Sequence, residues 1–343
     1  MPPGFDRARD ALAALRPRYF RVQVDWATVQ PRPDRPPNWE TYNSGCEQTA
    51  STCAPFLGVR DELRAVRSRQ RAGGGYEVVV NFLRVPPWAA RAPSGCESPR
   101  RDPTSSQLAP AALPAYRAML ESLLALGRRE GVPLRYWSAW NEPNFHLFVS
   151  PQRARCDAGA PSLAPAYYAQ LVRVLRATLA SAPGRHDIVL GELSDYSVAG
   201  QRGTSTVEFV RDLPRDVVCA GSIWAHHVYA GDVNTVDQVK TALDARGCPH
   251  RHRIWITETG TRTGNPAGDR AGCRRMDALL RRWYADPRVD AAFQYTFREA
   301  PQFPVGLADP TLQRLYPTYY LWRAWGGTRR PSAAPPSLPA QCR

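Results

Sequence analysis

Lysine is almost absent from this chain, because Lys240 is the only lysine among 343 residues and arginine carries nearly all of the formal charge of +14. Such a charge favours a nucleic-acid partner only if the basic residues gather on one face. Here they are scattered, and Arg-Arg pairs such as Arg128-Arg129 and Arg274-Arg275 fall in segments with a helix pattern, where a solvated face explains them. The sequence therefore predicts no nucleic-acid partner, and an anionic polymer such as a uronic-acid chain remains an alternative.

Long apolar runs are also lacking. No stretch approaches the roughly 20 apolar residues that cross a membrane, so no membrane span is predicted. The opening segment Met1–Leu15 lacks the apolar run of an export signal and resembles a loop followed by an amphipathic helix over Asp6–Leu15. If the protein is exported, we expect the signal to lie outside this chain.

The eight cysteines include no C-x-x-C pair and no cluster with zinc-ligand spacing, so no cysteine-bound metal site is predicted. An even number of cysteines in loops rich in Gly, Ser and Pro favours disulfides and a secreted or cell-envelope location. Cys46–Cys53 is the first pair expected, because it closes a short loop. The alternative is a set of unrelated buried thiols.

Short apolar runs alternate with longer helix-patterned segments, which is typical of a parallel α/β fold. The runs are Tyr19–Trp26, Tyr76–Leu83, Leu134–Trp140, Asp187–Leu193, Ser222–Tyr229, Arg253–Glu258 and Ala291–Phe297, and helix patterns cover Leu113–Arg129, Tyr167–Ala182, Val236–Arg246 and Arg274–Ala285. We predict a (β/α)8 TIM barrel over residues 1–325, with the first strand missing or irregular at the N-terminus, so that the runs are strands two to eight. Residues 326–343 form a Pro/Ser-rich tail, and a monomer is expected.

The segments that follow the strands are long and rich in Pro, Gly and aromatic residues, as in Pro31–Pro55 and Asn141–Pro165. In a barrel enzyme the strand-to-helix loops carry the site. We therefore searched the strand ends for reactive side chains.

Two glutamates end apolar strands. In Trp137-Ser-Ala-Trp-Asn-Glu-Pro-Asn144 the proline stops the strand and holds Glu142 at its carboxyl end, where Trp140 can desolvate it and raise its pKa. In Ile254-Trp-Ile-Thr-Glu-Thr-Gly260 the strand ends on Glu258. A loop glutamate beside a turn-forming proline, and a helix N-cap region rich in Thr and Glu, explain each motif alone without any catalysis.

Together, the two motifs resemble clan A of the glycoside hydrolases, a cellulase-like or xylosidase/iduronidase-like barrel group. Its Asn-Glu-Pro motif ends strand four and its nucleophilic glutamate ends strand seven, which are the positions of Glu142 and Glu258 when the runs are numbered two to eight. Arg21 in FRVQVDW resembles the arginine that orients the clan's nucleophile, and His227-Val-Tyr229 resembles its His-x-Tyr.

Further segments fit the same resemblance. Pro86-Pro-Trp-Ala89 is similar to a Pro-x-Trp-Ala segment of several clan families, and Gly306–Asp309 followed by Tyr316–Tyr319 looks like the loop that closes strand eight. The resemblance thus covers about residues 17–325.

The resemblance implies a retaining glycoside hydrolase acting on a poly- or oligosaccharide by double displacement, with Glu142 as acid/base, Glu258 as nucleophile and no cofactor. Expected substrate-binding residues are Arg21, Asn141, His227, Tyr229, Trp88, Trp39, Tyr295 and Glu299. His226 is expected to be structural, and Glu192 is the third-ranked carboxylate. The alternatives are a non-catalytic carbohydrate-binding barrel, a basic binder of an anionic polymer, and a transglycosylase that uses the same residues.

Overall fold

The chain folds around one curled sheet of seven parallel strands in the order β1-β2-β3-β4-β5-β6-β7, each beside its neighbour in the sequence. The computed structural model describes residues 8–40, 58–97, 102–195, 200, 202–229, 234–261, 266–300, 303–327 and 334–343. The strands are β1 Tyr19–Asp25, β2 Glu77–Leu83, β3 Leu134–Ser138, β4 Asp187–Leu193, β5 Ile223–Val228, β6 Arg253–Thr259 and β7 Val289–Gln294. Each overlaps one of the seven apolar runs, although β7 begins and ends earlier than its run, and this agreement confirms the predicted α/β barrel class.

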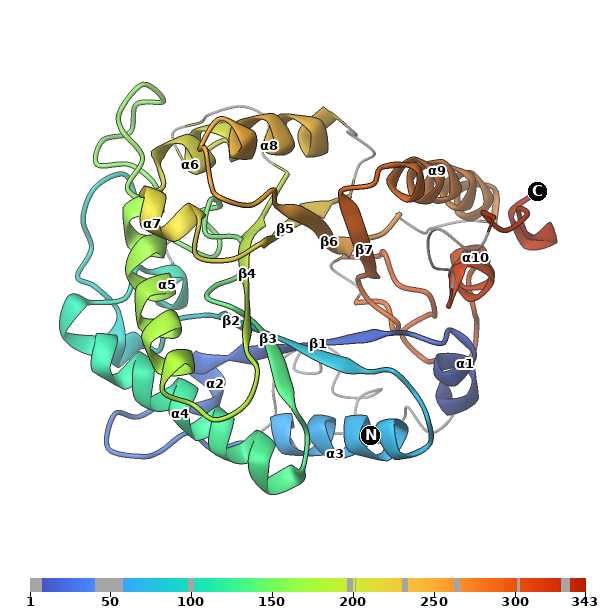
Figure 1. Cartoon of the computed structure of the whole chain (residues 1–343), viewed down its shortest axis with the longest axis horizontal. Coiled ribbons are helices and arrows are strands. Elements are labelled where there is room, and N and C mark those ends of the chain that lie inside the picture. The colour runs from blue at the N-terminus through green and yellow to red at the C-terminus, as the bar shows by residue number, and fades with distance from the viewer. Residues whose placement is uncertain are drawn as a thin grey trace.

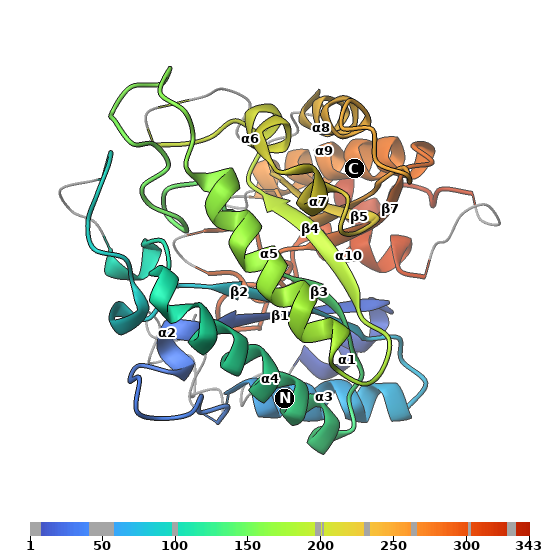
Figure 2. The same cartoon turned by 60° about the vertical axis from the view of Figure 1, so that its left-hand side comes forward.

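Helices form a ring outside this sheet (Figure 1), and the turned view shows α4 and α5 crossing the outer side of β3 and β4 (Figure 2). They are α1 Arg9–Ala14, α2 Trp26–Val29, α3 Gly58–Arg71, α4 Leu113–Glu130, α5 Ala164–Ala180, α6 Thr206–Asp212, α7 Arg215–Val218, α8 Asn234–Asp244, α9 Pro266–Ala285 and α10 Pro317–Trp325. Short 3-10 turns occur at Pro87–Ala89, Pro103–Ser105, Pro110–Ala112 and Ala340–Cys342. No helix in the described ranges is long and apolar enough to cross a membrane.

The sheet has two edges, β1 and β7, each paired with one neighbour in the described part of the chain. A cavity of about 1030 Å³ lies between them, and its inner wall carries the aromatic side chains Tyr19, Tyr136, Trp255 and Phe293. The predicted strand before α1 falls outside the described residues. The observed β1 to β7 therefore occupy the places predicted for strands two to eight.

Five helices were not predicted: α2, α3, α6, α7 and α10. In α3 the buried Val59, Leu63 and Val66 recur at a helical spacing between many arginines. Tyr316–Tyr319, predicted as a closing loop, instead begins α10, because Pro317 lies in its first turn, where proline needs no hydrogen-bond partner for its nitrogen. That part of the loop prediction was wrong.

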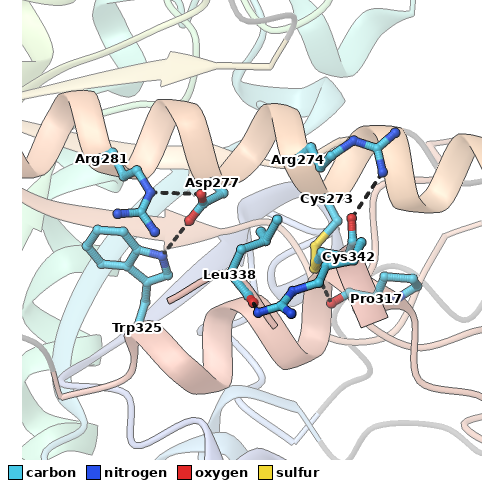
Figure 3. Close-up of a disulfide and its surroundings, with 9 residues drawn as sticks. Cys273, Arg274, Asp277, Arg281, Pro317, Trp325, Leu338 and Cys342 are labelled. Carbon is cyan, nitrogen blue, oxygen red and sulfur yellow. Dashed lines mark hydrogen bonds and ion pairs between the residues drawn. A yellow bond between two sulfur atoms is a disulfide. The ribbon is translucent and has the colours of Figure 1, made fainter. Parts of the chain in front are cut away.

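Three disulfides join described residues: Cys96–Cys156, Cys219–Cys248 and Cys273–Cys342. The predicted Cys46–Cys53 pair lies outside the described residues. Figure 3 shows how Cys342, close to the C-terminus, is fixed to α9, with Arg274 Nη1 donating to the Cys342 carbonyl oxygen at 3.1 Å. Both sulfur-bearing side chains are fully buried, so the end of the chain is part of the packed structure.

Removing the Cys273–Cys342 bond is expected to lower the free energy of unfolding by about 2–4 kcal/mol, because the bond closes a long loop in the unfolded chain. The two cysteines are 69 residues apart. The double variant Cys273→Ala/Cys342→Ala, compared with the wild type by urea unfolding, measures this difference. A loss below about 1 kcal/mol would show that the buried contacts of the segment, rather than the covalent bond, hold it in place.

Candidate active site

Two carboxylates meet at the carboxyl end of the sheet. Glu142 follows β3 and is 8% exposed, and Glu258 lies near the end of β6 and is 6% exposed. A carboxylate oxygen of Glu142, one of Glu258 and a ring nitrogen of His227 all lie within 4.8 Å of one another. Parallel strands bring their carboxyl ends to one rim of a barrel, which is why residues 116 positions apart in sequence can converge here.

Glu258 is surrounded by donors. Arg21 Nη1 donates to its Oε1 at 2.7 Å, and the hydroxyl of Tyr229 donates to its Oε2 at 2.5 Å. Gln23 Nε2 donates to Oε1 at 3.3 Å. Three donors from β1 and the end of β5 therefore fix the orientation of the Glu258 carboxyl group.

Glu142 has a different environment. Burial raises its pKa above the ordinary value, whereas the contact between its Oε1 and His227 Nδ1, at 2.8 Å, works in the opposite direction. Its backbone has a positive φ of 37°. A raised pKa suits a group that must donate a proton near neutral pH.

Asn141 lies beside Glu142 and is 2% exposed. Its Oδ1 accepts from Arg21 Nη2 at 2.8 Å. Since this contact fixes the amide plane, its Nδ2 group is the part that can donate to a ligand oxygen.

A third carboxylate joins the cluster. Glu192, near the end of β4, accepts from Arg21 Nη2 at 2.9 Å and from Thr257 Oγ1 at 2.9 Å, and its Oε2 lies 2.8 Å from His227 Nε2. Burial alone would raise its pKa, but Arg21 and His227 lower the pKa to about 2. Glu192 is therefore a buried anion that contacts residues from β1, β5 and β6.

Four predicted residues lie outside this hydrogen-bonded cluster. Trp39 is 5% exposed, packs in the core and donates from Nε1 to Ser122 Oγ at 3.0 Å, so its ring presents no free face to a sugar. Trp88 is half-buried against Trp26, and its Nε1 donates to a backbone oxygen. Tyr295 and Glu299 are half-buried on the wall of the cavity between β1 and β7, and Tyr295 contacts Tyr229 edge to face, with ring centroids 6.4 Å apart.

His226 differs from its neighbour. It is fully buried, and burial together with the nearby His227 lowers its pKa to about 3, so it is neutral. A neutral histidine in the core agrees with the structural role predicted for it.

Sequence reasoning missed Gln23 and Thr257. Gln23 lies two positions after Arg21 in β1, and side chains two apart in a strand point to the same face. This spacing was the available signal. Nothing in the sequence near Thr257 indicates its contact with Glu192, because that contact depends on the pairing of distant strands.

The cluster of Glu142, His227 and Glu258 also has the number of donor atoms that a metal ion needs. However, both ring nitrogens of His227 contact carboxylate oxygens at 2.8 Å, and nearby carboxylates, acting against burial, raise its pKa to about 10. A protonated imidazole has no lone pair to offer a metal. Arg21 adds a fixed positive charge, so these residues do not fit a metal centre.

The chain was compared with family models, with curated proteins and with solved structures, and only the solved structures identify its fold class. No family model matches the chain, and no curated protein matches it. Solved structures do match, and several of them are glycoside hydrolases, in agreement with the resemblance to clan A inferred from the motifs.

Three examples illustrate this. The family 30 subfamily 8 xylanase Xyn30A from Clostridium acetobutylicum superposes with a TM-score of 0.53 at 15% identity, over 94% of this chain and 66% of that one. A family 39 glycoside hydrolase from Bacteroides cellulosilyticus gives 0.55 at 16% identity, over 95% and 61%. The family 53 catalytic domain from Ignisphaera aggregans gives 0.54 at 13% identity, over 92% and 87%. The chain thus spans about two thirds of the first two proteins, and identities this low establish the shared fold alone.

Proposed function

We propose that this chain is a retaining glycoside hydrolase that cleaves a poly- or oligosaccharide, with Glu142 as acid/base and Glu258 as nucleophile. The observation that carries the proposal is the pair of buried carboxylates with oxygens within 4.8 Å of each other. Retaining enzymes place their two carboxyl groups at roughly 5–5.5 Å, whereas inverting enzymes leave about 6.5–9.5 Å for a water. The short separation supports double displacement.

The reaction follows from the two environments. In the first step Glu258 attacks the anomeric carbon, the glycosidic C–O bond breaks, and the leaving oxygen takes the proton of Glu142. In the second step Glu142 removes a proton from water, whose oxygen attacks the anomeric carbon and releases Glu258. Arg21 and Tyr229 hold the carboxyl group of the nucleophile in a fixed orientation.

Substrate contacts are proposed for residues at the rim of this site. Asn141 would donate to the sugar 2-hydroxyl, a hydrogen bond that strengthens in the transition state. Tyr295 and Glu299 would contact sugar rings and hydroxyls from the cavity wall, and Trp88 would present its exposed edge. Trp39 is left out because it is packed in the core.

The proposed protein is an exported monomer without a cofactor that acts on carbohydrate. Three disulfides support an oxidising compartment. Ion pairs such as Arg173–Asp216 and Arg282–Asp237 engage arginines of the outer helices, and this pairing supports leaving nucleic acid out of the proposal.

The test is covalent labelling with a panel of cyclophellitol-type and 2-fluoro sugar probes, read by intact mass. Wild type is expected to gain the mass of one glycosyl group, and Glu258→Gln is expected to gain none. The Glu121→Gln variant, which changes an exposed glutamate of α4, serves as the matched control and should be labelled like the wild type. A folded wild type that no probe labels would favour the non-catalytic carbohydrate-binding barrel.

A further inference from the structure

The cluster contains one carboxylate that neither step of the proposed reaction uses. Glu192 is fully buried, and its Oε2 contacts Arg21, His227 and Thr257 within 2.9 Å. A buried anion is costly unless charge and hydrogen bonds compensate it. One oxygen of Glu192 has three such partners, which come from three different strands. The fold therefore provides a specific binding environment for this carboxylate.

The backbone also fixes this side chain relative to Glu142. Gly191 has a φ of 88°, and a Cβ there would lie 2.5 Å from the carbonyl oxygen of Ala225, so only glycine fits. The pairing of β4 with β5 shifts register between Gly191 and Leu193, and Glu192 itself has a φ of 55°. The N–H of Glu142 then donates to the Glu192 carbonyl oxygen at 2.9 Å. Glu142 and Glu192 both have a positive φ, which is rare for residues other than glycine, and this backbone hydrogen bond links them.

His227 bridges the two side chains. Its Nδ1 lies 2.8 Å from Glu142 Oε1 and 3.5 Å from Glu258 Oε2, and its Nε2 lies 2.8 Å from Glu192 Oε2. The charged and titratable groups around it come from every neighbouring strand: Glu142, Glu192, Glu258, Arg21, His226, Tyr229, Tyr295 and Asp195. Burial opposes a charge on the ring, but three carboxylates within reach of one imidazole outweigh it.

We propose that Glu192 is a positioning residue that keeps both ring nitrogens of His227 protonated, so that His227 cannot take the acid proton of Glu142. The inference rests on the proposed function for the role of that proton. Arg21 and Thr257 hold Glu192 as an acceptor, and an acceptor at this position requires a hydrogen on His227 Nε2. A neutral ring would then present the lone pair of Nδ1 to Glu142 and compete for its proton. The protonated ring donates instead, which leaves the proton of Glu142 on Oε2, available to the leaving group.

The contact between His227 and Glu142 also contributes to the second step of the proposed reaction, the attack of water. Once Glu142 has lost its proton, the positive ring of His227 stabilises the carboxylate that must act as base. The sign of the pH effect follows from the charges. Removing the negative charge of Glu192 leaves the positive charges of Arg21 and His227 without this neighbouring anion. The surroundings become more positive, so His227 and Glu142 both release their protons at lower pH.

The primary experiment measures the protonation of His227 directly and needs no substrate. Wild type labelled with ¹⁵N-histidine is compared with Glu192→Gln and Thr257→Val, and the signal is assigned by its loss in His227→Gln. We expect both ring nitrogens of the wild type to remain protonated up to about pH 8, and the titration in Glu192→Gln to move at least about 2 pH units lower. Thr257→Val removes a hydrogen bond but no charge, so its titration should stay within about 0.5 unit of the wild type.

The second readout is catalytic. With phenyl and 2,4-dinitrophenyl glycosides of the sugar that labels the protein, Glu192→Gln should move the basic limb of kcat/KM about 1 pH unit lower. At pH 7 it should lose about 10-fold on the phenyl glycoside, which needs acid assistance, and less on the dinitrophenyl glycoside, which does not. Equal losses on both substrates would indicate a purely structural role and overturn the proposal.

The outcomes separate the two proposals. A wild type whose His227 is neutral at pH 7, or a Glu192→Gln variant with an unchanged titration, overturns the role of Glu192 even if the enzyme is active. If Glu192→Gln does not fold, a wild-type His227 that is neutral at pH 7 still overturns the proposal. A wild type that cleaves no glycoside refutes the proposed function, while the NMR titration still shows whether Glu192 sets the charge of His227.

Discussion

Glu258→Gln is expected to reduce kcat on any cleaved glycoside by about 10⁴-fold or more. The amide cannot form the covalent bond to the anomeric carbon, and neither of the other two glutamates of the cluster is placed to replace it. Glu192 is fully buried and already accepts from three donors, and Glu142 is needed on the opposite side of the reacting bond. The measurement is steady-state turnover of an aryl glycoside by purified wild type and variant.

The variant should remain folded, which makes the loss interpretable. Glutamine has almost the volume of glutamate, and its amide oxygen can still accept from Arg21. Arg21 also keeps Glu192 and Asn141 as partners, so no buried charge is left alone. Thermal unfolding of the two proteins checks this, with Glu121→Gln as the surface control. A folded Glu258→Gln that retains more than about 1% of the wild-type kcat would contradict the nucleophilic role.

The strands could be predicted because a parallel strand buried on both faces is apolar almost throughout. β2 and β5 are examples, since nearly every residue in them is buried. The helix α3 escaped prediction because charged and polar residues fill most of its length and only three apolar side chains face the core. The hydrophobic periodicity of a polar surface helix is weak. Such a helix is stabilised by packing against the sheet more than by the helix propensity of its residues.

The same contrast holds within the site. Glu142 and Glu258 could be predicted because each follows an apolar strand, and Arg21 because an arginine within an apolar strand needs a partner. The role of Glu192 could not be predicted. Its contacts come from three other strands, and its direction depends on an irregularity at Gly191 that shifts the register. Trp39 resembled a sugar-binding aromatic in the sequence, but only the fold shows that α4 covers it.

Glu142→Ala is expected to separate the two steps of the reaction. On substrates with poor leaving groups the loss in kcat/KM should be about 10²–10⁴-fold, because the leaving oxygen receives no proton. On 2,4-dinitrophenyl glycosides kcat/KM should change little, since that leaving group departs unprotonated. The variant then accumulates the glycosyl–enzyme intermediate, because the water of the second step lacks a base. A pre-steady-state burst of dinitrophenolate measures this accumulation.

Azide provides the decisive readout for Glu142→Ala. It is a small nucleophile that needs no base, and the alanine leaves room for it beside the anomeric carbon. Added azide should restore turnover of the dinitrophenyl glycoside and give a glycosyl azide with the configuration of the substrate, identified by proton NMR. Glu258→Gln should give no such product, because it forms no intermediate to trap. A product of inverted configuration from Glu142→Ala would place the carboxylates in the opposite roles, with Glu142 as the lost nucleophile. Equal loss on all leaving groups, with no effect of azide, would remove Glu142 from acid/base catalysis altogether.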